Sequence, residues 1–296
     1  MPDSVDQLSR GIRFEKSGVL DRALGEYDAV LASSDDPRLV AEAWRRRSSV
    51  LRTRCEWEGA LEAARRSAEV ATGAALWSLV GEALNAEAAV HESRGDFDRA
   101  VELLERVATI TDDERVVGIA LHNLGGIAAQ SGDLEVAEAR FTESHARFRR
   151  AGYAWGEAFA LNNLGRTALD RGEVARAESL LVRAIAAAQS AEDLDLKALA
   201  TLNRAEALAR MGRLTEAEDH ASGALGFFTF AGNDWRRIEC LRLLGDLCSQ
   251  QGNGDAAMRC FTQALDLARA IGAERERELL ERKVAGEGEA DGVVGA

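Results

Sequence analysis

The sequence predicts an all-α, right-handed solenoid, and three observations support this prediction. First, a pattern of glycine, a large apolar residue and then alanine recurs along the chain, as in residues 95–100 (GDFDRA) and 132–137 (GDLEVA). Second, the recurring alanines are 37 or 40 residues apart; they are Ala23, Ala60, Ala100, Ala137, Ala177, Ala217 and Ala257. Third, the 296 residues include only two prolines and 5% aromatic residues, which argues against β-structure. A fixed period of this size is typical of repeat proteins, in which each unit packs on its neighbours.

Each repeat unit is predicted to consist of two helices joined by a glycine turn. In the fifth unit, residues 157–170 carry apolar side chains at helical spacing: Ala160, Leu161, Leu164 and Ala168. Gly172 ends this helix, because glycine readily adopts the left-handed backbone that follows a helix C-terminus. The second helix covers residues 174–188, and one of its faces carries Val174, Ala177, Leu181 and Ala184.

These side chains resemble the tetratricopeptide repeat. In the fourth unit, the pattern consists of Leu121, Leu124, Gly125 and Ala128 on the first helix and Ala137, Phe141 and Ser144 on the second. One position on the first helix is small in every unit: Gly11, Ser48, Ala88, Gly125, Gly165, Ala205 and Gly245. Two helices that cross closely require this, since extra methylene groups there cost roughly 1–3 kcal/mol. The 40-residue period is similar to the repeat regions of large bacterial regulators and of peptide-binding scaffold proteins.

The resemblance covers residues 4–284 and predicts a single solenoid of about seven helix pairs. The expected units are residues 4–38, 39–77, 78–114, 115–154, 155–194, 195–234 and 235–272. Residues 273–284 are expected to form a helix that caps the last unit, and the glycine-rich, acidic residues 285–296 are expected to form a disordered tail. The second unit departs from the pattern, because Cys55 replaces the turn glycine and Ala64 replaces a bulky residue.

Composition and charge limit the classes of partner. The formal net charge of −13 repels nucleic acid and anionic membranes. Neither an N-terminal targeting segment nor an apolar run of membrane-spanning length is visible. The four cysteines lack the spacing of a metal site and are expected to be buried, reduced thiols; they are Cys55, Cys240, Cys248 and Cys260. These features predict a cytoplasmic protein.

The resemblance implies that the first helices of the units line a concave groove in which a peptide binds. Asn123, Asn163 and Asn203 occupy the same register in three successive units. An asparagine side chain both donates and accepts hydrogen bonds, so a row of three can hold the backbone of an extended peptide. The other candidates for this groove are Asn85, His122, Asn162, Arg166 and Arg242. The alternative interpretation is a solvated helix face without a ligand.

Arginines of the second unit form a candidate basic patch. Arg45, Arg46 and Arg52 lie on its predicted first helix and would attract an acidic segment, although a run of charge can equally be a solvated face. The carboxylate clamp of chaperone-binding relatives is incomplete here, since equivalent places hold Ser49, Ala86 and Ile119. A chaperone tail is therefore not the expected ligand.

The sequence contains no motif for catalysis, for a cofactor or for a metal. It lacks the phosphate-binding loop GxxxxGK[ST], the GxSxG elbow and the HExxH pair. The histidines are spread over different units, and His91 is expected to be a hydrogen-bonded core residue. We therefore expect a protein that is not an enzyme and that needs neither a cofactor nor a metal.

The function predicted from the sequence is that of a protein-interaction scaffold or adaptor that binds a peptide segment in the concave groove. The alternative is a regulatory sensor that responds to a small molecule or a peptide and acts through a partner chain. Self-association through exposed ends of the array is a third alternative. Neither nucleic acid nor a membrane is an expected partner.

Overall fold

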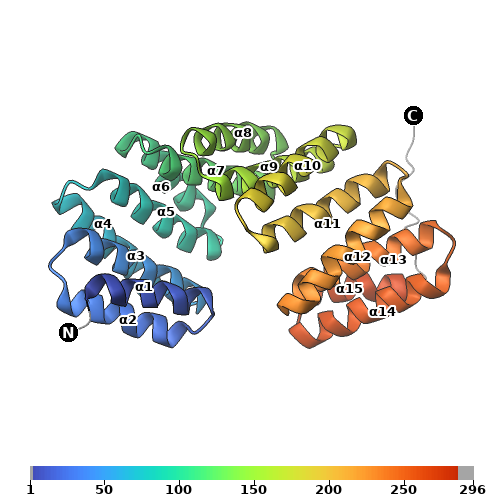
Figure 1. Ribbon diagram of the computed structural model, residues 1–296, viewed down its shortest axis with the longest axis horizontal. Coiled ribbons are helices and arrows are strands. Elements are labelled where there is room, and N and C mark those ends of the chain that lie inside the picture. Colours follow the sequence, from blue (N-terminus) through green and yellow to red (C-terminus); the bar gives the residue numbers. More distant parts are fainter. Residues whose placement is uncertain (1–2, 286–296) are drawn as a thin grey trace. The chain divides into compact units, whose positions relative to one another are not determined.

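A computed structural model describes residues 3–285 as an all-α protein (Figure 1). Within this range the chain forms fifteen helices and no strand, which confirms the predicted fold class. The helices are α1 (Ser4–Lys16), α2 (Leu20–Ser33), α3 (Pro37–Thr53), α4 (Trp57–Gly73), α5 (Trp77–Ser93), α6 (Phe97–Ile110), α7 (Glu114–Gln130), α8 (Leu134–Arg150), α9 (Ala154–Asp170), α10 (Val174–Ser190), α11 (Leu194–Arg210), α12 (Leu214–Ala231), α13 (Asp234–Gln250), α14 (Gly254–Ile271) and α15 (Glu274–Val284). Except for Ala285, the predicted tail over residues 285–296 lies outside the described residues.

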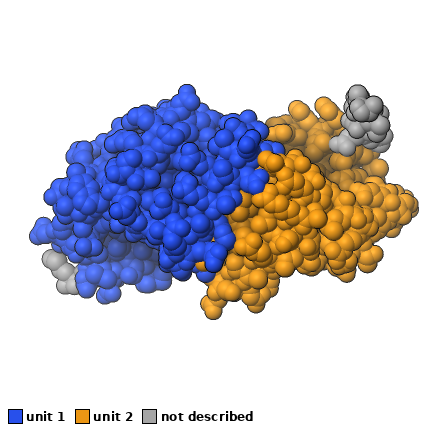
Figure 2. Space-filling model, turned by 90° about the horizontal axis from the view of Figure 1, so that it is seen from above, with its two compact units in different colours: residues 1–156 blue, residues 157–296 orange. Residues whose placement is uncertain are grey.

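The chain divides into two compact units, which are residues 1–156 and residues 157–296 (Figure 2). Helices α1 to α8 belong to the first unit and α10 to α15 to the second, whereas α9 begins in the first and ends in the second. The expectation that residues 4–284 form one domain stays a prediction.

Each unit is built from helix pairs that are arranged in two layers. In the first unit the pairs are α1–α2, α3–α4, α5–α6 and α7–α8, and the first helix of each pair also contacts the first helix of the next. The second unit repeats this arrangement with α11–α12 and α13–α14, and α11 contacts α13. Within each unit, the first helices of these pairs therefore lie side by side in one layer, which the second helices cover.

Glycine turns join the two helices of most pairs, as predicted. Gly132 after α7 and Gly172 after α9 have φ angles of 82° and 76°. The second pair makes the same turn without glycine, since Cys55 between α3 and α4 has a φ of 59°. A side chain in this left-handed region costs roughly 1–2 kcal/mol. Cys55 is exposed at the turn and Cys260 on α14 is only partly buried, which corrects the expectation that all four thiols are buried.

The small residues on the first helices lie where the two helices of a pair cross. A Cβ atom added to Gly125 would lie 2.7 Å from the ring of Phe141, and one added to Gly165 would lie 2.6 Å from Leu181. The recurring alanines, including Ala137 of the same pair as Gly125, are buried. Close packing at these crossings therefore explains the period that is visible in the sequence.

Helix α15 caps the last pair, which confirms the prediction for residues 273–284 apart from a start at Glu274. Leu280 is fully buried and belongs to the same apolar cluster as Phe261 of α14. Lys283 Nζ lies 2.7 Å from Asp246 Oδ1 of α13 and 5.3 Å from the centre of the Phe261 ring. Apolar burial and an ion pair together attach the cap.

Candidate ligand-binding grooves

Each compact unit contains a polar groove that is lined by first helices of its pairs. In the first unit, side chains of α3, α5 and α7 enclose a cavity of about 210 Å³. A neighbouring cavity of about 400 Å³ shares Arg52, Ala89 and Asn123 with it, and we call the two together the first groove. In the second unit, side chains of α9, α11 and α13 enclose about 430 Å³, the second groove. Both grooves lie on the layer that the sequence predicts to bind a ligand.

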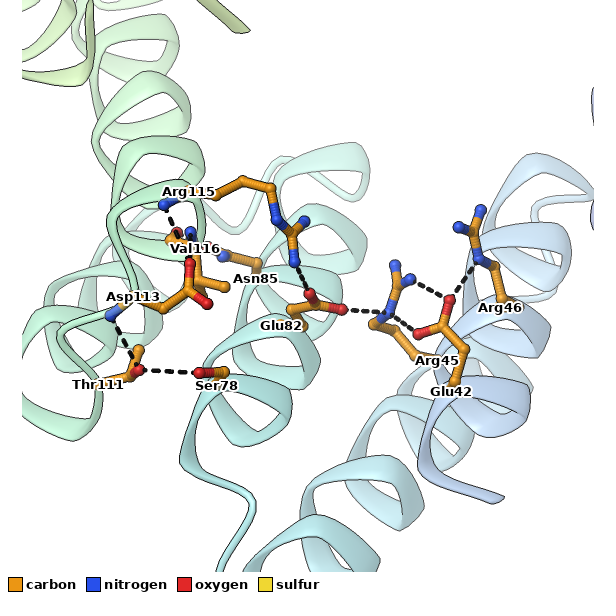
Figure 3. Close-up of polar contacts among 10 residues, drawn as sticks. All are labelled: Glu42, Arg45, Arg46, Ser78, Glu82, Asn85, Thr111, Asp113, Arg115 and Val116. Atoms are coloured by element: carbon orange, nitrogen blue, oxygen red, sulfur yellow. Dashed lines mark hydrogen bonds and ion pairs between the residues drawn. The ribbon is translucent and has the colours of Figure 1, made fainter. Parts of the chain in front are cut away.

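A chain of ion pairs borders the first groove (Figure 3). The Glu82 carboxylate on α5 accepts a hydrogen bond from Arg115 on α7 and lies 3.0 Å from Arg45 Nε on α3. Arg45 Nη2 lies 2.6 Å from Glu42 Oε1, and Arg46 Nε donates to the same oxygen at 2.8 Å. Two of the three arginines in the predicted basic patch are thus neutralised by carboxylates of the protein.

The ion pairs favour the charged forms of Glu42 and Arg115. Burial opposes the charged form of Glu42, but Arg45 and Arg46 outweigh it and hold the pKa of the carboxyl below its ordinary value. Burial likewise opposes the charge of Arg115, yet Glu82 raises the pKa of this guanidinium. The ion pairs link α3, α5 and α7.

Arg52 and Asn123 differ from these paired residues. Arg52 Nη1 lies 3.4 Å from Ser93 Oγ, and no carboxylate within residues 3–285 forms an ion pair with Arg52. The Asn123 side chain makes no hydrogen bond to any other residue of that range. Both side chains are partly exposed and line both cavities of the first groove.

Asn85 and His122, two further candidates from the sequence, lie deeper. Asn85 is buried, and its Nδ2 donates to the Val116 carbonyl at 3.1 Å, although the residue also borders the first groove. His122 is 8% exposed, and its ring centre lies 5.2 Å from that of Phe141. Burial lowers the pKa of His122 to about 4. Both side chains therefore take part in the packing of helices.

In the second groove, Arg166 belongs to an ion-pair network. Its Nη1 lies 2.6 Å from Glu206 Oε2, and its Nη2 lies 2.9 Å from Asp170 Oδ1. Glu206 Oε1 in turn lies 2.5 Å from Arg210 Nη2. Burial opposes the charge of Arg166, but Glu206 and Asp170 raise the pKa of its guanidinium. Arg166 thus links α9 to α11.

Arg242 has longer ion pairs at the other side of the second groove. Its Nη1 lies 3.8 Å from Asp246 Oδ2, and its Nε lies 4.0 Å from Glu276 Oε2 on the capping helix. Asp246 is also bonded to Lys283. The cap therefore contributes charge next to the groove.

Asparagines of the second unit form hydrogen bonds to one another. Asn203 Nδ2 donates to Asn162 Oδ1 at 2.9 Å, and Asn162 Nδ2 donates to Asn163 Oδ1 at 3.2 Å. Asn162 is buried, whereas Asn163 and Asn203 are partly exposed. Asn203 lines the second groove, while its amide also ties α11 to α9.

Glu82, Arg115 and Glu206 are among the groove residues that the sequence analysis does not single out. A signal for Glu206 exists, because Arg166, Glu206 and Asp246 follow one another at steps of 40 residues. Glu82 likewise follows Glu42 at a step of 40 residues, but only the packing of α5 between α3 and α7 brings Glu82 together with Arg45 and Arg115.

Metal sites and membrane-spanning helices are two further features that residues 3–285 could contain. No group of three or more histidine, cysteine, aspartate or glutamate side chains in this range is arranged to hold a metal ion. No helix in the described part of the chain combines the length and the hydropathy of a membrane span. His91 is buried with its Nδ1 2.9 Å from Asp96 Oδ2, as predicted for a hydrogen-bonded core histidine.

One curated relative and several solved structures are similar to this chain. The regulatory protein AfsR of Streptomyces griseus is 28% identical over 222 residues, which cover 64% of this chain and 22% of AfsR. The chain thus spans about a fifth of that protein. The apo form of the quorum sensor NprR from B. thuringiensis has a TM-score of 0.69 at 14% identity, over 88% of this chain and 75% of that chain.

Two further structures share the fold. A Rap protein complexed with competence and sporulation factor has a TM-score of 0.65 at 12% identity, over 95% of this chain and 80% of that chain. Aspartyl phosphate phosphatase F from Bacillus subtilis has a TM-score of 0.66 at 14% identity, over 88% and 69% of the two chains.

The repeat itself is matched directly. Tetratricopeptide repeat patterns match residues 83–117, 116–190 and 197–270. These matches extend over more than half of the 296 residues. The chain belongs to the tetratricopeptide repeat family.

Proposed function

We propose that this protein is a non-catalytic regulatory adaptor that binds an extended segment of a partner protein in the grooves of its two units. The observation that carries the proposal is the recurrence of polar side chains on the first helices, with Asn123 at the first groove and Asn203 at the second. The similarity to AfsR, which is named a regulatory protein, supports a regulatory role.

The chemistry of the grooves suits an extended backbone. An asparagine amide accepts from a backbone N–H and donates to a backbone C=O, and an extended segment presents both. In the second groove, Leu202 and Leu243 lie beside Asn203 and offer contact to apolar side chains of the segment. An apolar groove without amides would suit an amphipathic helix instead.

The absence of catalysis is part of the proposal. A catalytic acid, base or nucleophile must reach its substrate. Glu82 and Glu206 are each bonded to two arginines, and His122 is buried and neutral at pH 7. The similarity to aspartyl phosphate phosphatase F, at 14% identity, concerns the fold and not its activity. A cytosolic location is likewise proposed from the sequence alone.

Substitution of the asparagines tests the proposal. A peptide is selected from a display library of short random sequences, and its Kd is measured by fluorescence anisotropy. The variant N123A/N163A/N203A is expected to bind it at least tenfold more weakly, since each lost hydrogen bond is worth about 0.5–1.5 kcal/mol.

Gln263→Ala is the matched control, because Gln263 is an exposed amide on α14 outside both grooves. The single variant N123A is measured as well, since Asn203 also bonds Asn162, and its loss could weaken the fold. Circular dichroism and melting establish that each variant is folded. Equal affinity of the wild type and the triple variant, or failure of the library to yield a binder, would contradict the proposal.

The second candidate function is a sensor that binds a small molecule and acts through a partner chain. The observation in its favour is the fold similarity to a quorum sensor, NprR. A thermal-shift screen with metabolites separates the two candidates. A compound at 100 times its Kd adds about 2.7 kcal/mol to the stability of the folded state. A rise in Tm with a compound alone would favour the sensor.

A further inference from the structure

The compact unit of residues 157–296 exposes large apolar side chains along one edge. The helices of a pair are antiparallel, so the starts of α11, α13 and α15 and the ends of α12 and α14 lie at the same edge. The large apolar side chains exposed there, which we call the apolar edge, are Leu194, Phe230, Trp235 and Ile271, with exposed fractions of 61%, 92%, 46% and 41%. Among the described residues of this unit, the opposite edge with its glycine turns exposes only Met211 of this kind.

Packing within the chain does not explain these side chains. Phe230 is almost fully exposed, so its ring adds little to the core. The residues 40 positions before and after it are Ser190 and Ala270, so the repeat does not require an aromatic ring there. Exposed apolar side chains that gather in one place are typical of a surface that another molecule covers.

A row of three residues crosses the same edge at steps of 40 residues. Asp195, Trp235 and Arg275 are each the second residue of a helix, namely of α11, α13 and α15. Side chains in the first turn of a helix lean towards its N-terminus, so all three project at this edge. Asp195 and Arg275 are exposed, and neither forms an ion pair within residues 3–285. The row therefore runs from an acidic residue through an aromatic residue to a basic one.

The neighbouring charges preserve this order. Residues 192–197 contain three carboxylates and one lysine, so the end of the row at α11 is acidic. Next to Trp235 and at the other end of the row, most charges are paired within the chain: Asp234–Arg237, Glu239–Arg236, Glu274–Arg277 and Glu276–Arg242. These pairs leave Arg275 as the free cation at α15.

Such a row is complementary to itself. A two-fold axis through Trp235 brings Asp195 of one copy opposite Arg275 of the other copy, and the reverse contact forms on the other side of the axis. The same rotation places Trp235 opposite Trp235, and it places Phe230 on α12 opposite Ile271 on α14. A surface that matches itself in this way suits the closed, symmetric contact of a homodimer.

We propose that the protein forms a symmetric homodimer through the apolar edge, with ion pairs between Asp195 of one copy and Arg275 of the other that fix the register. Burial of the four apolar side chains favours association, and the two ion pairs select this orientation over others.

This inference is independent of the proposed function. Neither the row nor the apolar edge shares a residue with the second groove. The dimer therefore leaves the residues of that groove available and carries two copies of it, which strengthens binding to a partner with two recognition segments. Loss of peptide binding in the asparagine variant would not affect the dimer, and a monomeric protein could still bind a peptide.

Sedimentation velocity over a series of protein concentrations tests the proposal. The wild type is expected to change from monomer to dimer as its concentration rises. D195R places two arginines opposite each other at both contacts, and R275E places two carboxylates there. Each is expected to raise the Kd of the dimer about tenfold, because attraction becomes repulsion twice. F230S also raises the Kd, since it removes apolar area from the contact.

Two variants outside the contact serve as matched controls. D219R makes the same change in charge as D195R at an exposed position within α12, and M211S removes an exposed apolar side chain at the opposite edge. Both are expected to keep the Kd of the wild type. Circular dichroism and melting establish that each variant is folded.

An equimolar mixture of D195R and R275E tests the two-fold arrangement. In the mixed dimer the introduced arginine faces the introduced glutamate at one contact, and native Asp195 faces native Arg275 at the other. The mixture and the double variant D195R/R275E are therefore expected to regain the affinity of the wild type.

A wild type that stays monomeric at every concentration overturns the dimer. Equal Kd values for D195R and D219R, or a mixture of folded single variants that does not associate, overturn the pairing of Asp195 with Arg275. If a charge variant does not fold, F230S and M211S decide, and equal Kd values for these two overturn the apolar edge as the contact.

Discussion

His122 lies on α7 against Phe141, and burial lowers its pKa to about 4. An unfolded chain holds a histidine with a pKa of about 6.5. Between these values the unfolded state binds more protons than the folded state, so the free energy of unfolding falls as the pH drops from about 6.5 towards 4. The full effect of His122 is at most roughly 3–4 kcal/mol, at 1.36 kcal/mol per pKa unit.

We predict that H122L flattens this dependence, because leucine can pack beside Phe141 but does not titrate. Urea unfolding of the wild type and the variant at several pH values between 4.5 and 7 measures the two slopes. Carboxylates titrate in both proteins, so the difference between the slopes isolates His122. Identical slopes would show that His122 is protonated in the folded protein as readily as in the unfolded chain.

The role of a single side chain is predictable from the sequence where equivalent residues recur in the repeats, and it is missed where they do not. Gly125 is predictable as a small residue, because its equivalents recur in every unit and packing there tolerates no larger side chain. The register of Asn203 is visible too, but not its hydrogen bond to Asn162, which lies 41 residues away on α9. The pairing of Arg115 with Glu82 depends on the approach of two helices and on side-chain rotamers, and neither is encoded in a local pattern.

Among the helices and their turns, the turn at Cys55 allows a direct test of backbone strain. Cys55 adopts a φ of 59° at the turn between α3 and α4, where the other first helices end in glycine. We predict that C55G stabilises the protein by roughly 0.5–1 kcal/mol, because glycine relieves the left-handed strain but loses more backbone entropy on folding. C55A is the matched control, since alanine removes the thiol and keeps the strain.

Thermal melting of the wild type, C55G and C55A measures this effect. The Tm of C55G is expected to exceed that of C55A by a few degrees. A Tm of C55G at or below that of C55A would mean that the turn is not strained.

The positions of the helices along the chain are largely predictable from the sequence, because most helix pairs have their own glycine turn and their own spacing of apolar residues. The fifth unit illustrates this, since helices predicted over 157–170 and 174–188 correspond to α9 and α10. The second pair, α3 and α4, forms despite its degenerate turn, because Ala60 and Val50 are buried in the same way as their equivalents. Packing on neighbouring pairs also stabilises this pair, and the sequence of a single repeat does not reveal that contribution.

The grooves and the pairing of charges across helices are features of the whole molecule and not of a single repeat. Each of the two compact units has a layer of first helices with a polar groove. The whole chain carries a formal net charge of −13. Periodicity predicts that such a layer exists, but it does not predict which arginines remain unpaired within it. That distinction, which separates Arg52 from Arg45, depends on the three-dimensional pairing of charges across helices.

Photo-crosslinking tests most directly whether recognition takes place on the layer of first helices. The peptide selected by display is synthesised with a benzophenone at successive positions, irradiated in complex with the protein and mapped by mass spectrometry. The account predicts adducts on α3, α5 and α7 or on α11 and α13, and their loss in N123A/N163A/N203A. Adducts confined to second helices such as α4, α12 or α14, with unchanged yield in that variant, would contradict it.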